Sequence, residues 1–306
     1  MHSRALGAAA LTAIAWGMTG IFVFLLPPVS AFWIAGGRLL IGALCVLPWL
    51  LLSAGARHAL LAALRTPVAY LFAALLSLYY LSATSAFQHA PVAEVALLLC
   101  TAPIFVLLLR RLRGDVPARR EVGGALLALL GLGWILAPRL LGSQDGAHGN
   151  HLLGDVLAIA AAACTALYAD AYARLNRRQQ APSPLGTTLL TLILGSLLLL
   201  LVPVAAAMPL AAAFQTDTGA LWLLFGLGVL CTGIPSLSFA FASQHLPPLV
   251  TATISLLIPV FAAMFAALIL DQRLPLAMLP GSLVLLGGVA LVLYGSKAAT
   301  PVISGE

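Results

Sequence analysis

The sequence predicts an all-α integral membrane protein with ten transmembrane helices, arranged as two inverted-topology five-helix repeats with both termini cytoplasmic. Three observations predict this class: an apolar composition, apolar runs of about 20 residues, and one motif written twice. Of 306 residues, 62% are hydrophobic and only 8% are charged, whereas soluble domains carry about 25% charged residues. Runs of about 20 apolar residues match the thickness of a bilayer's hydrocarbon core.

The spans are expected to be helices, because lipid satisfies no backbone polar group and only helices or closed barrels cross it. Barrel strands alternate apolar and polar residues over about ten positions, whereas these segments are apolar on every face. The net charge of +6 does not indicate a nucleic-acid partner. The lipid bilayer is the first expected partner, and the sequence leaves the oligomeric state open.

The apolar runs set the expected helices and their grouping. They predict helices over residues 5–26, 30–52, 67–88, 91–110, 119–138, 152–174, 184–206, 219–244, 247–270 and 275–296. Residues 1–140 form the first repeat, 151–297 the second, and 298–306 a short C-terminal tail. The first run is longer than the 7–15-residue core of a signal peptide and lacks a convincing cleavage site, so we interpret it as a retained helix.

Basic residues lie unevenly on the two sides that these spans define. Twelve share a side with the N-terminus: Arg4, Arg57, Arg65, Arg110, Arg111, Arg113, Arg119, Arg120, Arg174, Arg177, Arg178 and Lys297. Only Arg139 and Arg273 fall on the other side, and Arg38 lies inside the second span. Cytoplasmic loops carry the excess of Lys and Arg, which places both termini in the cytoplasm.

One motif, A-x-Q-H-x-P followed by P-x-F, occurs twice, 156 residues apart. The matched pairs are Ala86 and Ala242, Gln88 and Gln244, His89 and His245, Pro91 and Pro247, Pro103 and Pro259, Phe105 and Phe261, Asp115 and Asp271, and Gly131 and Gly287. Because each half has five spans, the second enters the membrane from the opposite side. Inverted repeats are typical of secondary transporters, which bind substrate between the halves and alternate access.

The motif also supplies candidate gating residues. Gln-His ends one helix and proline begins the next, where its missing N–H is no loss; Pro103 and Pro259 are expected in mid-helix, where they permit kinks. The candidates are His89, Pro91, Glu94, Pro103, His245, Pro247 and Pro259. The alternative is that both motifs only shape tight hairpins.

Polar and aromatic residues within the spans supply candidate substrate contacts, because such groups are costly in lipid and face the bundle interior. They could line a mostly apolar cavity with aromatic walls and scattered hydroxyl groups. The candidates are Trp16, Thr19, Arg38, Tyr79, Tyr80, Thr84, Gln88, Thr165, Tyr168, Ser236, Ser238 and Gln244. For the hydroxyl residues, the competing interpretation is interhelical hydrogen bonding.

The charged candidates have competing interpretations as well. Arg38 could pair with a substrate carboxylate or a helix-terminal carbonyl, or it could anchor its helix by reaching the outer interface. Glu94 could relay protons, but its position predicts interfacial exposure. Asp170 precedes Arg174 by four residues, and an ion pair within the helix explains it. No deep carboxylate pair is apparent, so proton coupling is not predicted. The four cysteines lie singly, so no metal or other cofactor is expected.

The order and spacing of these features resemble the EamA type of the drug/metabolite transporter superfamily. The matching pieces are Ala15-Trp16-Gly17, Arg38 within F-W-I-A-G-G-R-L-L, and the A-P-I-F and I-P-V-F segments. The resemblance covers nearly the whole chain. It implies a bacterial inner membrane and export of small metabolites, with aromatic or hydrophobic amino acids as the leading substrates. Residues 184–206 carry no charge, so Arg38 has no counterpart in the second half.

Other functions fit the sequence less well. Lipophilic cations or sugar-linked metabolites are the alternative substrates, although a cation carrier is expected to hold a deep carboxylate beside aromatic residues. An intramembrane enzyme needs a clustered nucleophile and base, or metal ligands, but His89 and His245 are predicted on opposite faces. We therefore expect a transporter and not an enzyme.

Overall fold

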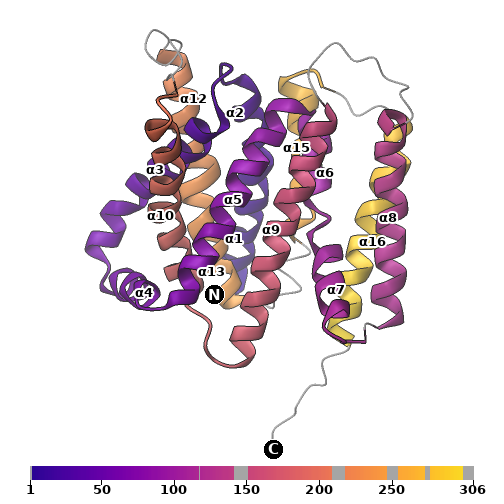
Figure 1. Cartoon of the computed structure of the whole chain (residues 1–306), viewed down its shortest axis with the longest axis horizontal. Coiled ribbons are helices and arrows are strands. Elements are labelled where there is room, and N and C mark those ends of the chain that lie inside the picture. The colour runs from indigo at the N-terminus through magenta and orange to yellow at the C-terminus, as the bar shows by residue number, and fades with distance from the viewer. Residues whose placement is uncertain are drawn as a thin grey trace, which may run out of the picture.

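A computed structural model describes residues 2–116, 118–140, 151–208, 218–246, 254–272 and 276–298. Every regular element within these ranges is helical, and the helices stand side by side as an upright bundle (Figure 1). Eight helical segments are long and apolar enough to cross a membrane: Ser3–Leu25, Ala31–Leu52, Pro67–His89, Val92–Leu112, His151–Arg177, Pro184–Ala205, Thr218–Ala242 and Leu276–Tyr294. The chain is therefore a multi-pass membrane protein.

The two other predicted spans also contain helices. Residues 119–138 fall in α8 (Arg119–Leu140), and residues 247–270 include the 12-residue α15 (Ile258–Ile269). Residues 247–253, and with them the candidate Pro247, lie outside the described part of the chain. Ten crossings therefore stay a prediction.

Several spans are broken where the sequence analysis expected continuous helices. The first divides at Met18 into α1 (His2–Gly17) and α2 (Thr19–Leu25), and the fourth divides into α6 (Val92–Leu99) and α7 (Ala102–Leu112). The prediction that Pro103 and Pro259 lie in mid-helix was wrong. Each stands in the first turn of a helix, α7 or α15, where the fixed φ of proline suits helix initiation.

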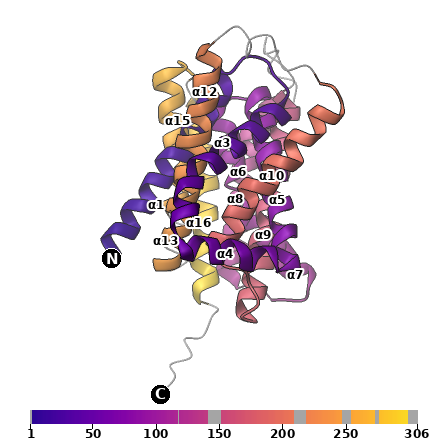
Figure 2. The same cartoon turned by 90° about the vertical axis from the view of Figure 1, so that its left-hand side faces the viewer.

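Helix α4 (Ala54–Leu64) was not predicted. The side chain of Ser53 accepts a hydrogen bond from Ala56 N (3.2 Å) and so caps the helix N-terminus, while Ala and Leu favour helix throughout the segment. Figure 2 shows α4 lying across the lower end of the bundle, beneath α3 (Ala31–Leu52) and α10 (Pro184–Ala205). A search for long apolar runs passes over such a helix, because it lies along the surface and spans nothing.

The closest helix pair joins the two halves of the chain: α8 packs along α16 (Leu279–Ala298), at one edge of the bundle in Figure 1. Glycines make the contact. A Cβ on Gly131 would lie 2.6 Å from the Gly281 carbonyl oxygen, and one on Gly288 would lie 2.6 Å from the Gly124 oxygen. Gly124 thus meets Gly288, and the later Gly131 meets the earlier Gly281, so the two helices run antiparallel with their backbones in contact.

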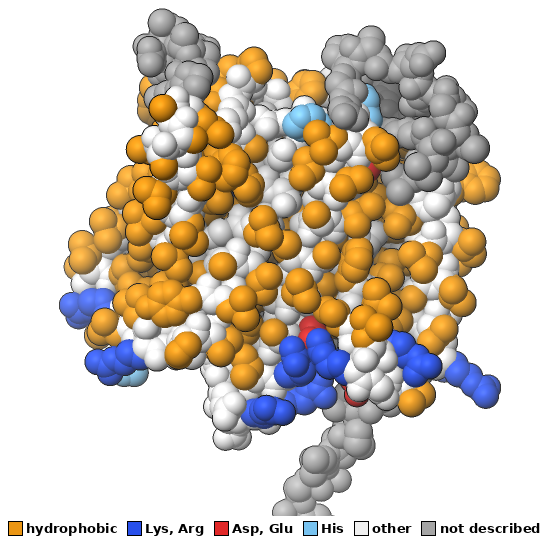
Figure 3. Space-filling model, in the orientation of Figure 1, with side chains coloured by type: hydrophobic (Ala, Val, Ile, Leu, Met, Phe, Trp, Pro, Cys, Tyr) orange, Lys and Arg blue, Asp and Glu red, His pale blue; other side chains and the backbone are white. Residues whose placement is uncertain are grey.

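Basic residues gather at one end of the bundle. In the view of Figure 3, lysine and arginine side chains lie along the lower edge, and the middle of the face is apolar. Helix α16 ends toward this same edge (Figure 1). The distribution agrees with the count of twelve basic residues against two from the sequence.

Candidate substrate site

Arg38 is buried where α3 meets the span Thr218–Ala242. Only 2% of the residue is exposed. Its Nε donates a hydrogen bond to Thr232 Oγ1 (2.8 Å), and one terminal nitrogen donates to the Cys231 carbonyl oxygen (3.2 Å). Both partners belong to a π-helical turn, Val229–Gly233, which joins α12 (Thr218–Gly228) to α13 (Ile234–His245). The guanidinium therefore does not reach for the outer interface.

Glycines allow α3 to approach this turn closely. A Cβ added to Gly228 would lie 2.5 Å from Ile41 Cβ and 3.1 Å from the Arg38 carbonyl oxygen. The π-turn ends two residues before Pro235, and wide turns of this kind are frequent at functional sites. Here the π-turn leaves the Cys231 carbonyl oxygen available to accept a hydrogen bond from the buried guanidinium of Arg38.

The other side of Arg38 meets a tyrosine pair on α5 (Pro67–His89). The guanidinium carbon lies 5.0 Å from the centre of the Tyr80 ring, a cation–π distance. The rings of Tyr79 and Tyr80 meet edge to face, with centroids 5.3 Å apart. Within the described residues, Arg38 forms no ion pair with a carboxylate, and three of its five N–H donors make no hydrogen bond.

Aromatic rings form two further groups around predicted residues. Trp16 packs on Phe239 of α13 with ring centroids 5.1 Å apart. Tyr168, on α9 (His151–Arg177), meets Phe72 edge to face at 5.1 Å and Tyr172 at 5.8 Å. The first group joins the two halves of the chain, and so does the second. Phe239 and Phe72 were missed by the sequence analysis because apolar aromatics are unremarkable in a span.

Several predicted hydroxyl and amide groups make local or structural bonds. Gln88 donates to the Val29 carbonyl oxygen (2.7 Å), which ties α5 to the loop before α3. Thr165 donates to Ala161 O within its own helix (3.1 Å). In contrast, Thr84 is fully buried, and its hydroxyl has no hydrogen-bond partner among the described residues.

The remaining binding candidates lie on two elements. Thr19 begins α2, within hydrogen-bonding reach of the Cys231 thiol. Ser236 is buried and Ser238 is partly buried on α13, whereas the side chain of Gln244 lies outside the described residues. The structure thus brings Thr19, Arg38, Tyr79 and Tyr80 to one region through the π-turn, and the substrate contacts themselves stay predictions.

The two motif histidines share one local geometry. Nδ1 of His89 lies 2.7 Å from Ser85 O, and Nδ1 of His245 lies 2.8 Å from Phe241 O. Each histidine is the last residue of its helix, and Pro91 caps the next helix in the first half. Both contacts lie within a single helix turn, so the inverted repeat and a gating role for either turn stay predictions.

Glu94 is the clearest correction among the charged candidates. The sequence analysis expected interfacial exposure, but Glu94 is 1% exposed in the first turn of α6. Asp155 on α9, which the sequence analysis missed, is also 1% exposed. Its neighbour Gly154 packs on Ala90, at the turn that precedes α6. Glu94 and Asp155 are thus buried carboxylates near the beginnings of α6 and α9, and a role for either in proton coupling is not tested by their burial.

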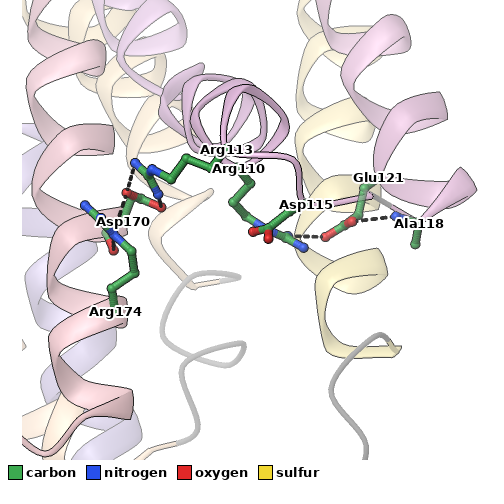
Figure 4. Close-up of polar contacts among 7 residues, drawn as sticks. All are labelled: Arg110, Arg113, Asp115, Ala118, Glu121, Asp170 and Arg174. Carbon is green, nitrogen blue, oxygen red and sulfur yellow. Dashed lines mark hydrogen bonds and ion pairs between the residues drawn. The ribbon is translucent and has the colours of Figure 1, made fainter.

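At the basic end, ion pairs fasten α7 to its neighbours (Figure 4). Arg113 binds both carboxylate oxygens of Asp170, at 2.8 and 2.5 Å, and Arg174 lies 3.3 Å from the same carboxylate, as predicted. Asp170 is only 5% exposed, and its hydrogen bonds raise the pKa of Arg113 above the usual value. Arg110 binds Glu121 at 2.7 Å, and Glu121 also accepts from Ala118 N. The Arg113–Asp170 pair connects the first half of the chain to the second.

The comparisons with known proteins agree with this architecture. A weak relative, an uncharacterized transporter of Archaeoglobus fulgidus, is 26% identical over 207 residues, which are 68% of this chain and 69% of that protein. One protein of known crystal structure aligns with 98% of this chain and 100% of its own, with a TM-score of 0.63 at 19% identity, which supports the fold alone. The model of the EamA-like transporter family matches twice, at residues 3–137 and 152–294. The chain therefore belongs to the EamA-like transporter family.

Proposed function

We propose that this transporter exports small metabolites that carry a carboxylate, and that aromatic or hydrophobic amino acids are its leading substrates. The observation that carries the proposal is Arg38, a buried cation with spare N–H donors set against the Tyr79–Tyr80 pair. A guanidinium fork matches a carboxylate, and tyrosine faces suit an aromatic or aliphatic side chain. The bacterial inner membrane, with both termini cytoplasmic, is the proposed location.

Alternating access between two inverted repeats is the proposed mechanism. Two features support it. Helices α8 and α16, the fifth of each proposed repeat, each carry glycines seven residues apart that pair antiparallel, as a two-fold axis in the membrane plane requires. The histidine turns of the two halves also share one geometry. Arg38 is 2% exposed, so substrate reaches it only after the halves move apart.

Counterflow in proteoliposomes tests the proposed substrate class. Vesicles holding the purified full-length protein and a high internal concentration of phenylalanine should accumulate labelled phenylalanine transiently from outside, with pH clamped on both sides. Unlabelled amino acids should compete, and their decarboxylated amines should compete at least tenfold less well, because the proposed site binds the carboxylate. If no amino acid of a broad panel gives counterflow, the proposed substrate class is wrong.

One observation favours a second substrate class. Glu94 and Asp155 are buried, and a buried carboxylate is the group that a lipophilic-cation carrier is expected to hold. The same vesicles distinguish the two proposals, since quaternary ammonium ions would then exchange and amino acids would not.

We also propose that the Arg113–Asp170 pair acts as a latch, which holds the two halves of the chain together at the basic end of the bundle. Replacing Asp170 with asparagine should favour the state that is open at that end, because the bidentate pair between the halves is lost. In a cysteine-free background, we expect Thr165→Cys, further into the bundle on α9, to react at least fivefold faster with a membrane-impermeant maleimide from that side.

The control for this latch is Arg174→Gln, which leaves the bidentate pair intact and removes only a half-exposed neighbour at 3.3 Å. Surface ion pairs of this kind contribute about 0–1 kcal/mol, so labelling should change little. Equal labelling rates in the Asp170→Asn protein and the unmodified protein would exclude the latch.

A further inference from the structure

An open apolar groove runs along the outside of the bundle between α7, α8 and α9. Its cavity volume is about 410 Å³. The lining side chains include Leu108, Leu126, Leu129 and Ile159, and its only charged member is Arg111. Leu108, Leu126 and Leu129 are each about half exposed, so the groove opens toward the surrounding lipid. It is separate from Arg38 and the tyrosine pair.

Arg111 differs from Arg110 and Arg113, because among the described residues it is paired with no carboxylate. Arg110 binds Glu121 and Arg113 binds Asp170, whereas Arg111 forms no ion pair within the part of the chain that the structure describes. The same holds for Arg119 and Arg120, which begin α8 on the same basic end. An exposed, uncompensated cation thus stands at one end of an apolar groove.

We propose that this groove binds one anionic phospholipid of the adjacent leaflet. An acyl chain lies against the leucines of α7 and α8, and the phosphate group pairs with Arg111, with Arg119 and Arg120 adding to the local potential. Basic pockets between helices on the cytoplasmic side bind anionic head groups in this way, and each Lys or Arg near the surface contributes about 1 kcal/mol. The apolar lining alone would accept any lipid, so Arg111 is what selects the charge.

A second groove provides an internal control. It lies between α3 and α10, has a volume of about 270 Å³, and is lined entirely by apolar side chains, including Leu47. Lacking a cation, it offers nothing that distinguishes an anionic head group from a zwitterionic one. Preference for anionic lipid should therefore depend on the first groove and not on the second.

Native mass spectrometry of the full-length protein in detergent tests the proposal, with phosphatidylglycerol and phosphatidylcholine of identical acyl chains as probes. We expect one phosphatidylglycerol to bind at least fivefold more tightly than phosphatidylcholine. Arg111→Gln should remove most of this preference, about fivefold in affinity for one lost charge. Leu126→Trp should fill the groove and weaken binding of both lipids.

Two control variants separate the groove from general effects. Leu47→Trp fills the second groove, and Arg57→Gln removes an exposed charge from α4; both should bind phosphatidylglycerol like the unmodified protein. Thermal unfolding without added lipid confirms that every variant is folded. The proposal is overturned if the two lipids bind equally, if Arg111→Gln keeps the preference, or if the control variants lose it to the same extent.

Discussion

Replacing Arg38 with glutamine is expected to reduce transport of a carboxylate substrate about 100-fold or more. The guanidinium is buried and keeps N–H donors beyond those that bind Thr232 and Cys231. Hydrogen bonds to charged groups contribute about 1.5–3 kcal/mol each, and the loss of the two bonds that a guanidinium fork makes to a carboxylate gives this scale. Initial rates of counterflow for phenylalanine provide the measurement.

A purely structural role for Arg38 would also reduce transport, so the test needs a readout that separates the two. If Arg38 binds the carboxylate, Arg38→Gln should erase the preference for an amino acid over its decarboxylated amine. Arg38→Lys should recover little, because an ammonium cannot reproduce the planar fork. If both substrates lose rate by the same factor, the residue only holds α3 against the π-turn.

Thr232→Val is the matched control for that structural role. It removes the acceptor of the 2.8 Å bond from Arg38 Nε and leaves the guanidinium and its cation–π contact in place. We expect lower thermal stability with the preference for the carboxylate retained. Loss of the preference in Thr232→Val would mean that the position of Arg38, as well as its charge, determines selectivity.

Span positions could be predicted from the sequence because bilayer thickness fixes their length. The segments expected at 30–52, 67–88 and 184–206 correspond to Ala31–Leu52, Pro67–His89 and Pro184–Ala205. Hydropathy measures how apolar a segment is and says nothing of the hydrogen-bonding pattern within it. It therefore could not reveal the break at residues 100–101 or the π-turn at Val229–Gly233. At the break, the hydrogen bonds are local and run from Cys100 N to Leu97 O and from Thr101 N to Leu98 O. At the π-turn, Arg38 on α3 donates to the Cys231 carbonyl oxygen, a contact that exists only in the folded chain.

The candidate site was predictable only in part, for a related reason. Arg38 stood out because a charge inside a span is costly, and the tyrosines stood out as a polar aromatic pair. Thr232 is 194 residues away from Arg38, and nothing local to it indicates a contact. Arg113 was counted only as a topogenic charge, because its bond to Asp170 exists only once α7 and α9 are packed.

The contact between the glycines of α8 and α16, which we call the glycine seam, shows that the repeat does not predict which single residues touch. The 156-residue offset pairs Gly131 with Gly287, but a Cβ on Gly287 would meet nothing within 4 Å. The glycines in contact are Gly124 with Gly288 and Gly131 with Gly281. The offset that matches these four positions between the halves is 157, which relates Gly124 to Gly281 and Gly131 to Gly288. Sequence similarity locates the repeat, and packing decides which of two adjacent glycines faces the partner helix.

The seam carries the second large prediction: Gly288→Ala should destabilise the protein by about 3 kcal/mol or more. The added methyl group would lie 2.6 Å from the Gly124 carbonyl oxygen and closer still to Ala128 N. These are backbone atoms, which cannot turn aside as a side chain does, so α8 and α16 would have to separate. Overpacking of a tight contact costs about 1–3 kcal/mol and sometimes more. Thermal unfolding in detergent measures the loss.

Neighbouring glycines make this prediction specific. Gly287→Ala on α16 and Gly133→Ala on α8 place the same methyl group where nothing lies within 4 Å, and both changes improve helix propensity by up to about 1 kcal/mol. They should leave stability unchanged or raise it. If all three variants unfold alike, backbone contact does not hold the halves together. A second outcome would be informative about the motion: only Gly288→Ala is destabilised, and the folded variant still transports at the normal rate. In that case α8 and α16 stay in contact during transport, and the motion that exposes Arg38 occurs in the other helices.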